Sequence, residues 1–232
     1  MDKTEQVLSS SRSPSMPRQS FSLLRESLRN PSLLSFVSQI RSTLAGCQHV
    51  LDVGCGNASP MRFIVKTHLT GLDGYAPALE EARRQGTHNE YYLGNVTQLG
   101  RLFTPRKFDA CIALDVIEHL HKDDGWRMLE DMERLAIRRV VIFTPNGFVP
   151  QKSKDGDLQE HLSGWTADEM RARGYRVLGM YGPKSWRGEY HRIKYQPRPF
   201  WVLLSIAAHY LYTRSHPEKA AAIFCVKDLS KR

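Results

Sequence analysis

Two glycines and two aspartates stand where a buried strand would meet a ligand. The apolar run HVLDV at 49–53 stops abruptly at Gly54, and Gly56 follows two residues later. Glycine lets the backbone turn sharply and leaves room for a ligand against the main chain. Asp52 precedes this turn, and Asp73 ends the next apolar run. Because an acid at the end of a second strand can accept hydrogen bonds from both ribose hydroxyls, the pattern predicts a nucleoside-binding site.

A second group of reactive side chains follows later apolar runs. The segment FDACIALDVIEHL at 108–120 contains Asp115, Glu118 and His119 near its end. His161 lies in QEHLSGWT at 159–166. Histidine is the usual base when a hydroxyl or an amine must lose a proton. Loops after neighbouring parallel strands meet at one edge of a sheet, so we expect His119 and His161 near the same rim. A structural role as a helix cap or a packed ring is the alternative for each.

The same residues could hold a metal ion. Asp115, Glu118 and His119 form a D-x-x-E-H cluster that can lie on one side of a helical turn, and His161 could complete four ligands. Carboxylates and imidazoles suit several divalent ions, so the pattern does not select one. A divalent metal is therefore an open possibility, and no metal is assigned.

The spacing of apolar runs along the chain predicts the strands and helices that position these residues. Apolar runs bounded by polar residues or glycine predict strands at 49–53, 68–73, 90–93, 108–116, 138–144, 175–181 and 221–227. Helical spacing or helix-start signals predict helices at 21–29, 32–44, 59–66, 77–85, 124–136 and 165–173. Strands that alternate with helices predict an α/β fold, with a doubly wound, seven-stranded, mostly parallel sheet of Rossmann-like type. We expect helices on both faces and an antiparallel C-terminal strand.

The chain divides into a tail, a domain and an insert. Residues 1–20 are rich in Ser, Pro and Arg and are expected to be a disordered tail. Residues 21–232 are expected to form a single domain, with an insert at 182–219. The apolar segment at 199–212 is too short to cross a bilayer, so no transmembrane segment is expected. It could form a lid that packs on the domain, or a surface that meets lipid or a lipid-linked substrate.

Composition places the chain among soluble globular proteins with a basic surface. The sequence is 41% hydrophobic and 25% charged, and its formal net charge is +9. A positive charge favours anionic partners, including nucleic acid, phospholipid surfaces and phosphorylated small molecules. The four cysteines show no metal-binding spacing, and Cys111 and Cys225 lie in apolar runs where they are expected to be buried. We expect a cytoplasmic protein, with a peripheral place at a membrane surface as an alternative.

The glycine loop, the acid at the second strand and FDxxxxxDVIEHL together resemble class I S-adenosylmethionine-dependent methyltransferases of the type 11-like group. The resemblance covers 49–227 and implies S-adenosylmethionine as the cofactor. It implies roles for residues after the first four strands: Asp52, Gly54, Cys55 and Gly56 at the amino-acid end, Asp73 and Gly74 at the ribose, Asn95 and Val96 at the adenine, and Asp115 beside the methionine moiety. Ala58 and Asn95 depart mildly from the usual glycine and aspartate.

The acceptor is less constrained than the cofactor. Candidate bases at the rim favour O-methylation of a small-molecule acceptor, anionic or lipid-linked ones included, with His119 and His161 as catalytic residues. Small-RNA ribose methyltransferases carry a similar E-x-x-E-H, then TPN, then a histidine shortly before Trp-Thr. A metal-assisted RNA ribose methyltransferase is therefore an alternative, and nucleic acid stays open as a partner. A non-catalytic cofactor-binding or scaffold domain is the other alternative.

Overall fold

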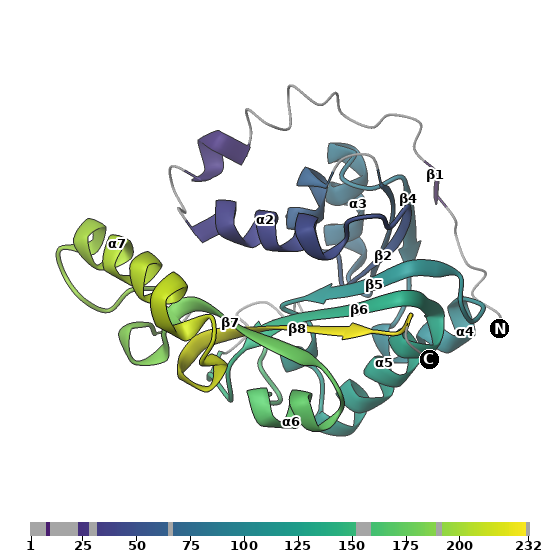
Figure 1. Cartoon of the computed structure of the whole chain (residues 1–232). Helices are drawn as coiled ribbons and strands as arrows, with labels where there is room; N and C mark the ends of the chain where they lie inside the picture. Colours follow the sequence, from purple (N-terminus) through teal and green to yellow (C-terminus); the bar gives the residue numbers. More distant parts are fainter. Residues whose placement is uncertain are drawn as a thin grey trace. The chain divides into compact units, whose positions relative to one another are not determined.

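The structure is a computed structural model that describes residues 8–9, 23–27, 32–64, 67–151, 159–188 and 192–230 (Figure 1). The chain forms two compact units. The first comprises Met1–Leu114, Trp126–Val140 and Leu229–Arg232, and the second comprises Asp115–Gly125 and Val141–Asp228. Helix α5 (Lys122–Leu135) and strand β6 (Ala136–Pro145) each contribute residues to both units.

A parallel sheet forms the centre of the first unit. It contains β2 (His49–Val53), β3 (His68–Asp73), β4 (Glu90–Leu93) and β5 (Phe108–Leu114). The order is β4-β3-β2-β5, with β6 next to β5, and β2 pairs in parallel with both β3 and β5. The chain thus builds β3 and β4 on one side of β2 and then returns to the other side. This reversal is the doubly wound arrangement that the alternation of strands and helices predicted.

The apolar runs become the buried centre of this unit. Val50, Leu51 and Val53 of β2 are fully buried, because β2 has a paired strand on each side and apolar neighbours above and below. Helix α3 (Ala76–Gln85) buries Leu79 and Ala82. It ends at Gly86, whose left-handed backbone (φ 63°) suits glycine and closes the helix. Other helices of this unit are α2 (Ser32–Thr43), the short α4 (Leu99–Leu102) and residues 23–27, which lie within the helix predicted at 21–29.

The second unit is built on an antiparallel strand pair. Strands β7 (Arg176–Pro183) and β8 (Ala220–Asp228) pair in antiparallel register, and the strand order is β6-β8-β7. Helix α6 (Ala167–Ala172) begins at a capping box, in which Thr166 and Glu169 satisfy each other's backbone N–H groups. Between β7 and β8 lie α7 (Arg198–Ala208), a π-helical turn (His209–Thr213) and a short turn at Pro217–Lys219.

The predicted fold class is confirmed, and the seven predicted strands correspond to β2 to β8. One helix was predicted wrongly: in place of a helix at 59–66, a single 3-10 turn spans Pro60–Phe63. Ser59 does cap this turn, but Ile64 already has an extended backbone. The strand predicted at 108–116 ends at Leu114, because Asp115 has a left-handed backbone (φ 54°) that cannot continue a strand.

Two predictions about the ends and the insert have partial structural counterparts. The tail predicted at 1–20 falls mostly outside the described residues. Leu8–Ser9 form the two-residue strand β1, which pairs antiparallel with β4. The apolar segment predicted at 199–212 corresponds to α7 and the π-helical turn after it. Within the described part of the chain, no helix is long and apolar enough to span a membrane.

The cysteines behave as small hydrophobic residues, as predicted for Cys111 and Cys225. All four, Cys47, Cys55, Cys111 and Cys225, are buried and carry free thiols. Burial raises the pKa of each thiol above its ordinary value, because the thiolate loses its hydration.

Candidate functional site

The glycine loop after β2 has an open side. Gly54 and Gly56 both have left-handed backbones, with φ of 69° and 53°. The N–H groups of Gly54 and Cys55 donate to the carbonyl oxygen of Leu72 at 2.7 and 3.0 Å, which fixes the turn against β3. A side chain at Gly56 would meet no atom within 4 Å. The loop is therefore firmly shaped by its backbone and leaves space beside Gly56 for a ligand.

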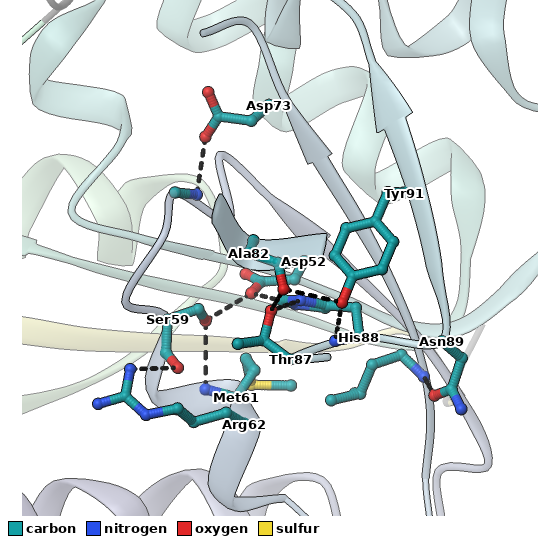
Figure 2. A network of polar contacts seen from close by, with 12 residues as sticks. Asp52, Ser59, Met61, Arg62, Asp73, Ala82, Thr87, His88, Asn89 and Tyr91 are labelled. Atoms are coloured by element: carbon teal, nitrogen blue, oxygen red, sulfur yellow. Dashed lines mark hydrogen bonds and ion pairs between the residues drawn. The ribbon is translucent and has the colours of Figure 1, made fainter. Parts of the chain in front are cut away.

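Asp73 connects the end of β3 to this loop. One carboxylate oxygen accepts a hydrogen bond from the Gly56 N–H at 2.7 Å (Figure 2). The other accepts from the Tyr75 N–H at 2.7 Å. The side chain is half-buried, and Gly74 after it is exposed. The predicted ribose acid and the predicted glycine loop thus lie in direct contact.

Asp52 points into the core of the first unit. Its carboxylate is 1% exposed and accepts from the Ser59 hydroxyl at 2.6 Å. The Nε2 atom of His88 lies 2.9 Å from the same oxygen, Oδ2 (Figure 2). A hydrogen bond from the His88 N–H to the Tyr91 hydroxyl adds to this buried network. Asp52 therefore shapes the loop through Ser59. No motif in the sequence identifies His88 as its partner.

Asn95 begins the short turn after β4. Its side-chain oxygen accepts from both the N–H and the hydroxyl of Thr97, each at 2.9 Å. Asn95 is exposed and Val96 is half-buried. The Gly94 N–H donates to the Asp73 carbonyl oxygen at 3.0 Å. The predicted adenine residues thus directly follow a strand end that is bonded to the end of β3.

His119 and His161 lie together in the second unit. Their ring centroids are 4.9 Å apart, at an interplanar angle of 68°. The Nδ1 atom of His119 lies 3.0 Å from the Glu160 carbonyl oxygen, and that of His161 lies 2.7 Å from the Val149 carbonyl oxygen. A carbonyl oxygen can only accept, so in each neutral ring the proton is on Nδ1 and the lone pair is on Nε2. Burial lowers the pKa of His161, which favours its neutral form.

The segment that carries His161 is held against the turn that carries His119. The carbonyl oxygen of Glu118 accepts from the Leu162 and Ser163 N–H groups at 2.8 and 3.0 Å. The indole N–H of the fully buried Trp165 donates to the Ile117 carbonyl oxygen at 3.2 Å. Residues 161–165 are therefore fixed by backbone and indole hydrogen bonds, which explains why two histidines far apart in sequence meet.

The Thr-Pro-Asn segment at the end of β6 supports this arrangement. The Thr144 hydroxyl donates to the Glu118 carboxylate at 2.9 Å. The Asn146 amide donates to the carbonyl oxygens of Pro217, Glu218 and Ala220 at 2.9, 3.2 and 2.9 Å. Asn146 thus ties the end of the insert to the end of β6, whereas Thr144 orients a carboxylate.

Asp115 and Glu118 form a pair of neighbouring carboxyl groups. The pKa of Glu118 is raised well above its ordinary value, because its side chain is buried and the charge of Asp115 lies beside it. Asp115 is the more exposed of the two. Burial also raises the pKa of Asp115, to about 7. Because Glu118 is the more deeply buried of the two, a proton shared by the pair resides on Glu118.

A pocket of about 280 Å³ opens at these residues. Its lining has two acids, two histidines and two amides, with no lysine or arginine: Asp115, Glu118, His119, Pro145, Val149, Gln151, Gln159 and His161. Gln151 and Gln159 were not predicted, because acceptor pockets are built from loops whose sequence has no periodic signal. The pocket can therefore hold a small polar group against two imidazole nitrogens.

Three side chains could also hold a metal ion. One ligand atom from each of Glu118, His119 and His161 lies within 4.8 Å of the others. A carboxylate and two imidazoles suit a divalent transition metal, and the lining has no lysine or arginine to balance the charge of the acids. These residues therefore fit a divalent cation.

Known proteins with related sequence or structure point to one chemistry. Residues 50–137 match the family model described as a methyltransferase domain. A probable tRNA methyltransferase 9B from Bos taurus is 26% identical over 117 residues, which are 50% of this chain. The match covers 25% of that protein, so the chain spans about a quarter of its relative's length.

Two solved structures share the fold. A S-adenosylmethionine-dependent methyltransferase from Archaeoglobus fulgidus aligns with a TM-score of 0.57 and 13% identity, over 90% of this chain and 99% of that one. The methyltransferase domain of a bacterial Hen1 protein aligns with a TM-score of 0.51 and 17% identity, over 93% and 100%. At these identities the likeness is one of fold. Residues 50–137 thus match a methyltransferase domain, within a fold that the chain shares with S-adenosylmethionine-dependent methyltransferases.

Proposed function

We propose that the enzyme transfers the methyl group of S-adenosylmethionine to a hydroxyl group of a small-molecule acceptor. The observation that carries this proposal is the pair of imidazoles at the pocket, each held at Nδ1 by a backbone carbonyl oxygen. A hydroxyl group holds its proton tightly and gains from a base at the moment of transfer. An amine acceptor loses its proton to solvent beforehand and has less need of such a pair.

Most of the residues proposed to hold the cofactor belong to the first unit, and Asp115 belongs to the second. The open loop at Gly54, Cys55 and Gly56 accommodates the amino-acid end, and the Asp73 carboxylate accepts from the ribose hydroxyls. Gly74, Asn95 and Val96 follow the neighbouring strand ends, and Asp115 follows β5. S-adenosylmethionine supplies the electrophilic methyl group when it is bound.

The residues proposed to act on the acceptor are His119 and His161. Each presents Nε2 as the basic nitrogen, so either can accept the hydroxyl proton of the acceptor. Gln151 and Gln159 offer amide donors and acceptors that orient polar groups of a small molecule. The positive charge of the chain favours encounter with an anionic acceptor. Its anionic group would lie outside this pocket, whose lining has two acids and no lysine or arginine.

Methyl transfer from labelled cofactor to fractionated cell extract tests the proposal, with mass identification of the labelled product. His119→Ala and His161→Ala should each lower turnover by about a hundredfold or more, while calorimetry finds unchanged affinity for S-adenosylhomocysteine. His121→Ala, at an exposed histidine outside the pocket lining, is the matched control. Full activity of both pocket variants would rule out a base at this pocket.

A second candidate is a metal-assisted ribose methyltransferase that acts on RNA. The observation that favours it is the cluster of Glu118, His119 and His161, to which Asp115 adds a second carboxylate. The names of two similar proteins refer to tRNA and to Hen1, respectively. Bound at these ligands, a divalent ion would supply a Lewis acid toward ribose hydroxyls.

Chelation separates the two candidates. If the metal-assisted reaction holds, EDTA should abolish methylation of an RNA oligonucleotide, and added Mn²⁺ or Co²⁺ should restore it. Glu118→Gln should prevent this recovery and should lower Mn²⁺ binding measured by calorimetry. Activity toward a small molecule that survives EDTA would favour the metal-free reaction, with the histidines as bases.

A further inference from the structure

Helix α7 and the turn after it carry an exposed stripe of large apolar side chains. We define the apolar stripe as Phe200, Leu203, Leu204, Tyr210 and Leu211, which are 58%, 69%, 38%, 56% and 84% exposed. The spacing of three, four and seven residues places the first, second, third and last of these on one side of a helix. Figure 1 shows α7 leading away from β7 and β8 of its own unit.

The opposite side of the same helix includes a buried polar contact. Ser205 is 1% exposed, and its hydroxyl donates to the Tyr181 carbonyl oxygen at 3.1 Å. The Arg187 guanidinium donates to the Ser205 hydroxyl at 3.0 Å. His209, in the π-helical turn, is 4% exposed. Trp201, Val202 and Ile206 are half-buried. Helix α7 thus directs apolar residues toward the protein and also exposes the apolar stripe, unlike a surface helix whose outer side is polar.

The stripe is bordered by positive charge. Residues 192–217 contain no aspartate or glutamate. They contain four basic residues, of which Arg192, Lys194 and Arg198 are exposed and Arg214 is half-buried. Tyr195 and Tyr212 add exposed aromatic rings, at 42% and 47%. Leucines bordered by arginine, lysine and tyrosine are the composition of helices that lie in the plane of a membrane interface.

We propose that the apolar stripe docks this enzyme on the surface of a phospholipid bilayer that contains anionic lipids. Eleven residues of α7 extend roughly 16 Å, enough to lie in the interface and too short to cross it. The leucines enter the acyl boundary, and the basic residues meet lipid phosphates. The inference is independent of which acceptor is methylated.

Other occupants fit the stripe less well. Single-stranded RNA is bound by aromatic stacking and phosphate contacts, which leaves the most exposed residues, Leu203 and Leu211, without a role. A second copy related by two-fold symmetry would bring the basic borders of both stripes together without acids between them. A membrane with anionic headgroups can bury the leucines among its acyl chains and pair its phosphates with the basic residues.

Vesicle sedimentation with the full chain tests the proposal. The protein should bind vesicles of phosphatidylcholine with 30% phosphatidylglycerol at low salt, and binding should weaken at 0.5 M NaCl or with phosphatidylcholine alone. Leu203→Ser with Leu211→Ser should lower the partition coefficient about tenfold. Lys194→Gln with Arg198→Gln should lower binding to the anionic vesicles only. Leu24→Ser with Leu34→Ser, at exposed leucines on other helical segments, should bind like the wild type.

Several outcomes would overturn the proposal. One is the absence of binding to anionic vesicles, and another is equal binding by the wild type and the Leu203→Ser, Leu211→Ser protein. A dimer seen in sedimentation velocity and lost in that variant, without vesicle binding, would assign the stripe to a second copy. Oligonucleotide binding lost in that variant, again without vesicle binding, would assign it to RNA.

Discussion

At the scale of single residues, the two aspartates near the glycine loop have different environments. Asp52 is buried against Ser59 and His88, so its charge is used to hold the loop. Asp73 is half-buried, and backbone N–H groups at Gly56 and Tyr75 bind its two oxygens. Because Asp73 is the more exposed of the two, its carboxylate is the one that can accept hydrogen bonds from a ribose.

Replacing Asp73 should therefore weaken cofactor binding. Asp73→Ala removes a charged acceptor from the ribose hydroxyls and releases Gly56, at a cost of about 1.5–3 kcal/mol in binding free energy. Calorimetry with S-adenosylhomocysteine on folded protein measures this loss. Asp73→Asn keeps one acceptor oxygen and should lose less, and unchanged affinity in the alanine variant would remove Asp73 from the site.

At the scale of elements, the pocket depends on how closely α5 approaches the segment at 161–165. A Cβ atom at Gly125 would lie 2.4 Å from Cζ2 of Trp165 and 3.2 Å from Cγ1 of Ile117. Since the Trp165 indole is bonded to Ile117, a side chain at Gly125 would push apart the two segments that carry His161 and His119.

Gly125→Ala should consequently damage the acceptor pocket and leave cofactor binding intact. We expect a loss of about 1–3 kcal/mol in the free energy of unfolding, because the overlap is with a rigid ring, and a fall in turnover. Urea denaturation and calorimetry measure the two effects. Gly188→Ala, whose nearest neighbour would be Lys194 at 3.4 Å, should be tolerated. Wild-type stability in Gly125→Ala would mean that Trp165 can move aside.

The buried His209 makes the insert sensitive to acid. Neither ring nitrogen has a hydrogen-bond partner among the described residues. Burial, with the positive charges of Arg214 and Arg187 nearby, lowers the pKa of His209 to about 4. Between pH 6.5 and about 4, His209 is therefore protonated in the unfolded chain and neutral in the folded chain. The contribution of His209 to stability is complete above pH 6.5 and is lost as the pH falls toward 4.

His209→Phe should flatten this dependence. Between pH 7.5 and 5.0 the wild type should lose about 2 kcal/mol more unfolding free energy than the variant, since one pKa unit is worth about 1.4 kcal/mol. Urea denaturation at the two pH values measures the difference. His121→Gln, at an exposed histidine, should keep the wild-type dependence; equal slopes for His209→Phe and the wild type would contradict the prediction.

The sequence predicted strands better than helices, for a physical reason. A buried strand such as β2 is a continuous apolar run that stops at a glycine, so its ends are local signals. The predicted helix at 59–66 rested on the cap at Ser59 and on Pro60, which the 3-10 turn also satisfies. The exposure of the leucines of α7 and the inward direction of Asp52 depend on tertiary neighbours that no local pattern encodes. The meeting of His119 and His161 was predictable because it follows from strand order.

At the scale of the whole molecule, the N-terminal residues contribute little described structure. Among the described residues, pairing of β1 with β4 joins Leu8 to Tyr91 and Ser9 to Glu90. A chain that starts at Gln19 should keep its cofactor affinity and melt within about 2 °C of the full chain, because polar, proline-rich residues bury little surface. Differential scanning calorimetry checks this, and a larger drop would show that β1 anchors the end of the sheet.

The burial of every cysteine has a practical consequence for labelling. Thiolate is the form that reacts with maleimides and oxidants. All four thiols are buried, and burial raises the pKa of each. We therefore expect the native protein to react slowly with thiol reagents. A fluorophore attached through Leu211→Cys would report from one position only, at the tip of the apolar stripe, without removal of the native cysteines.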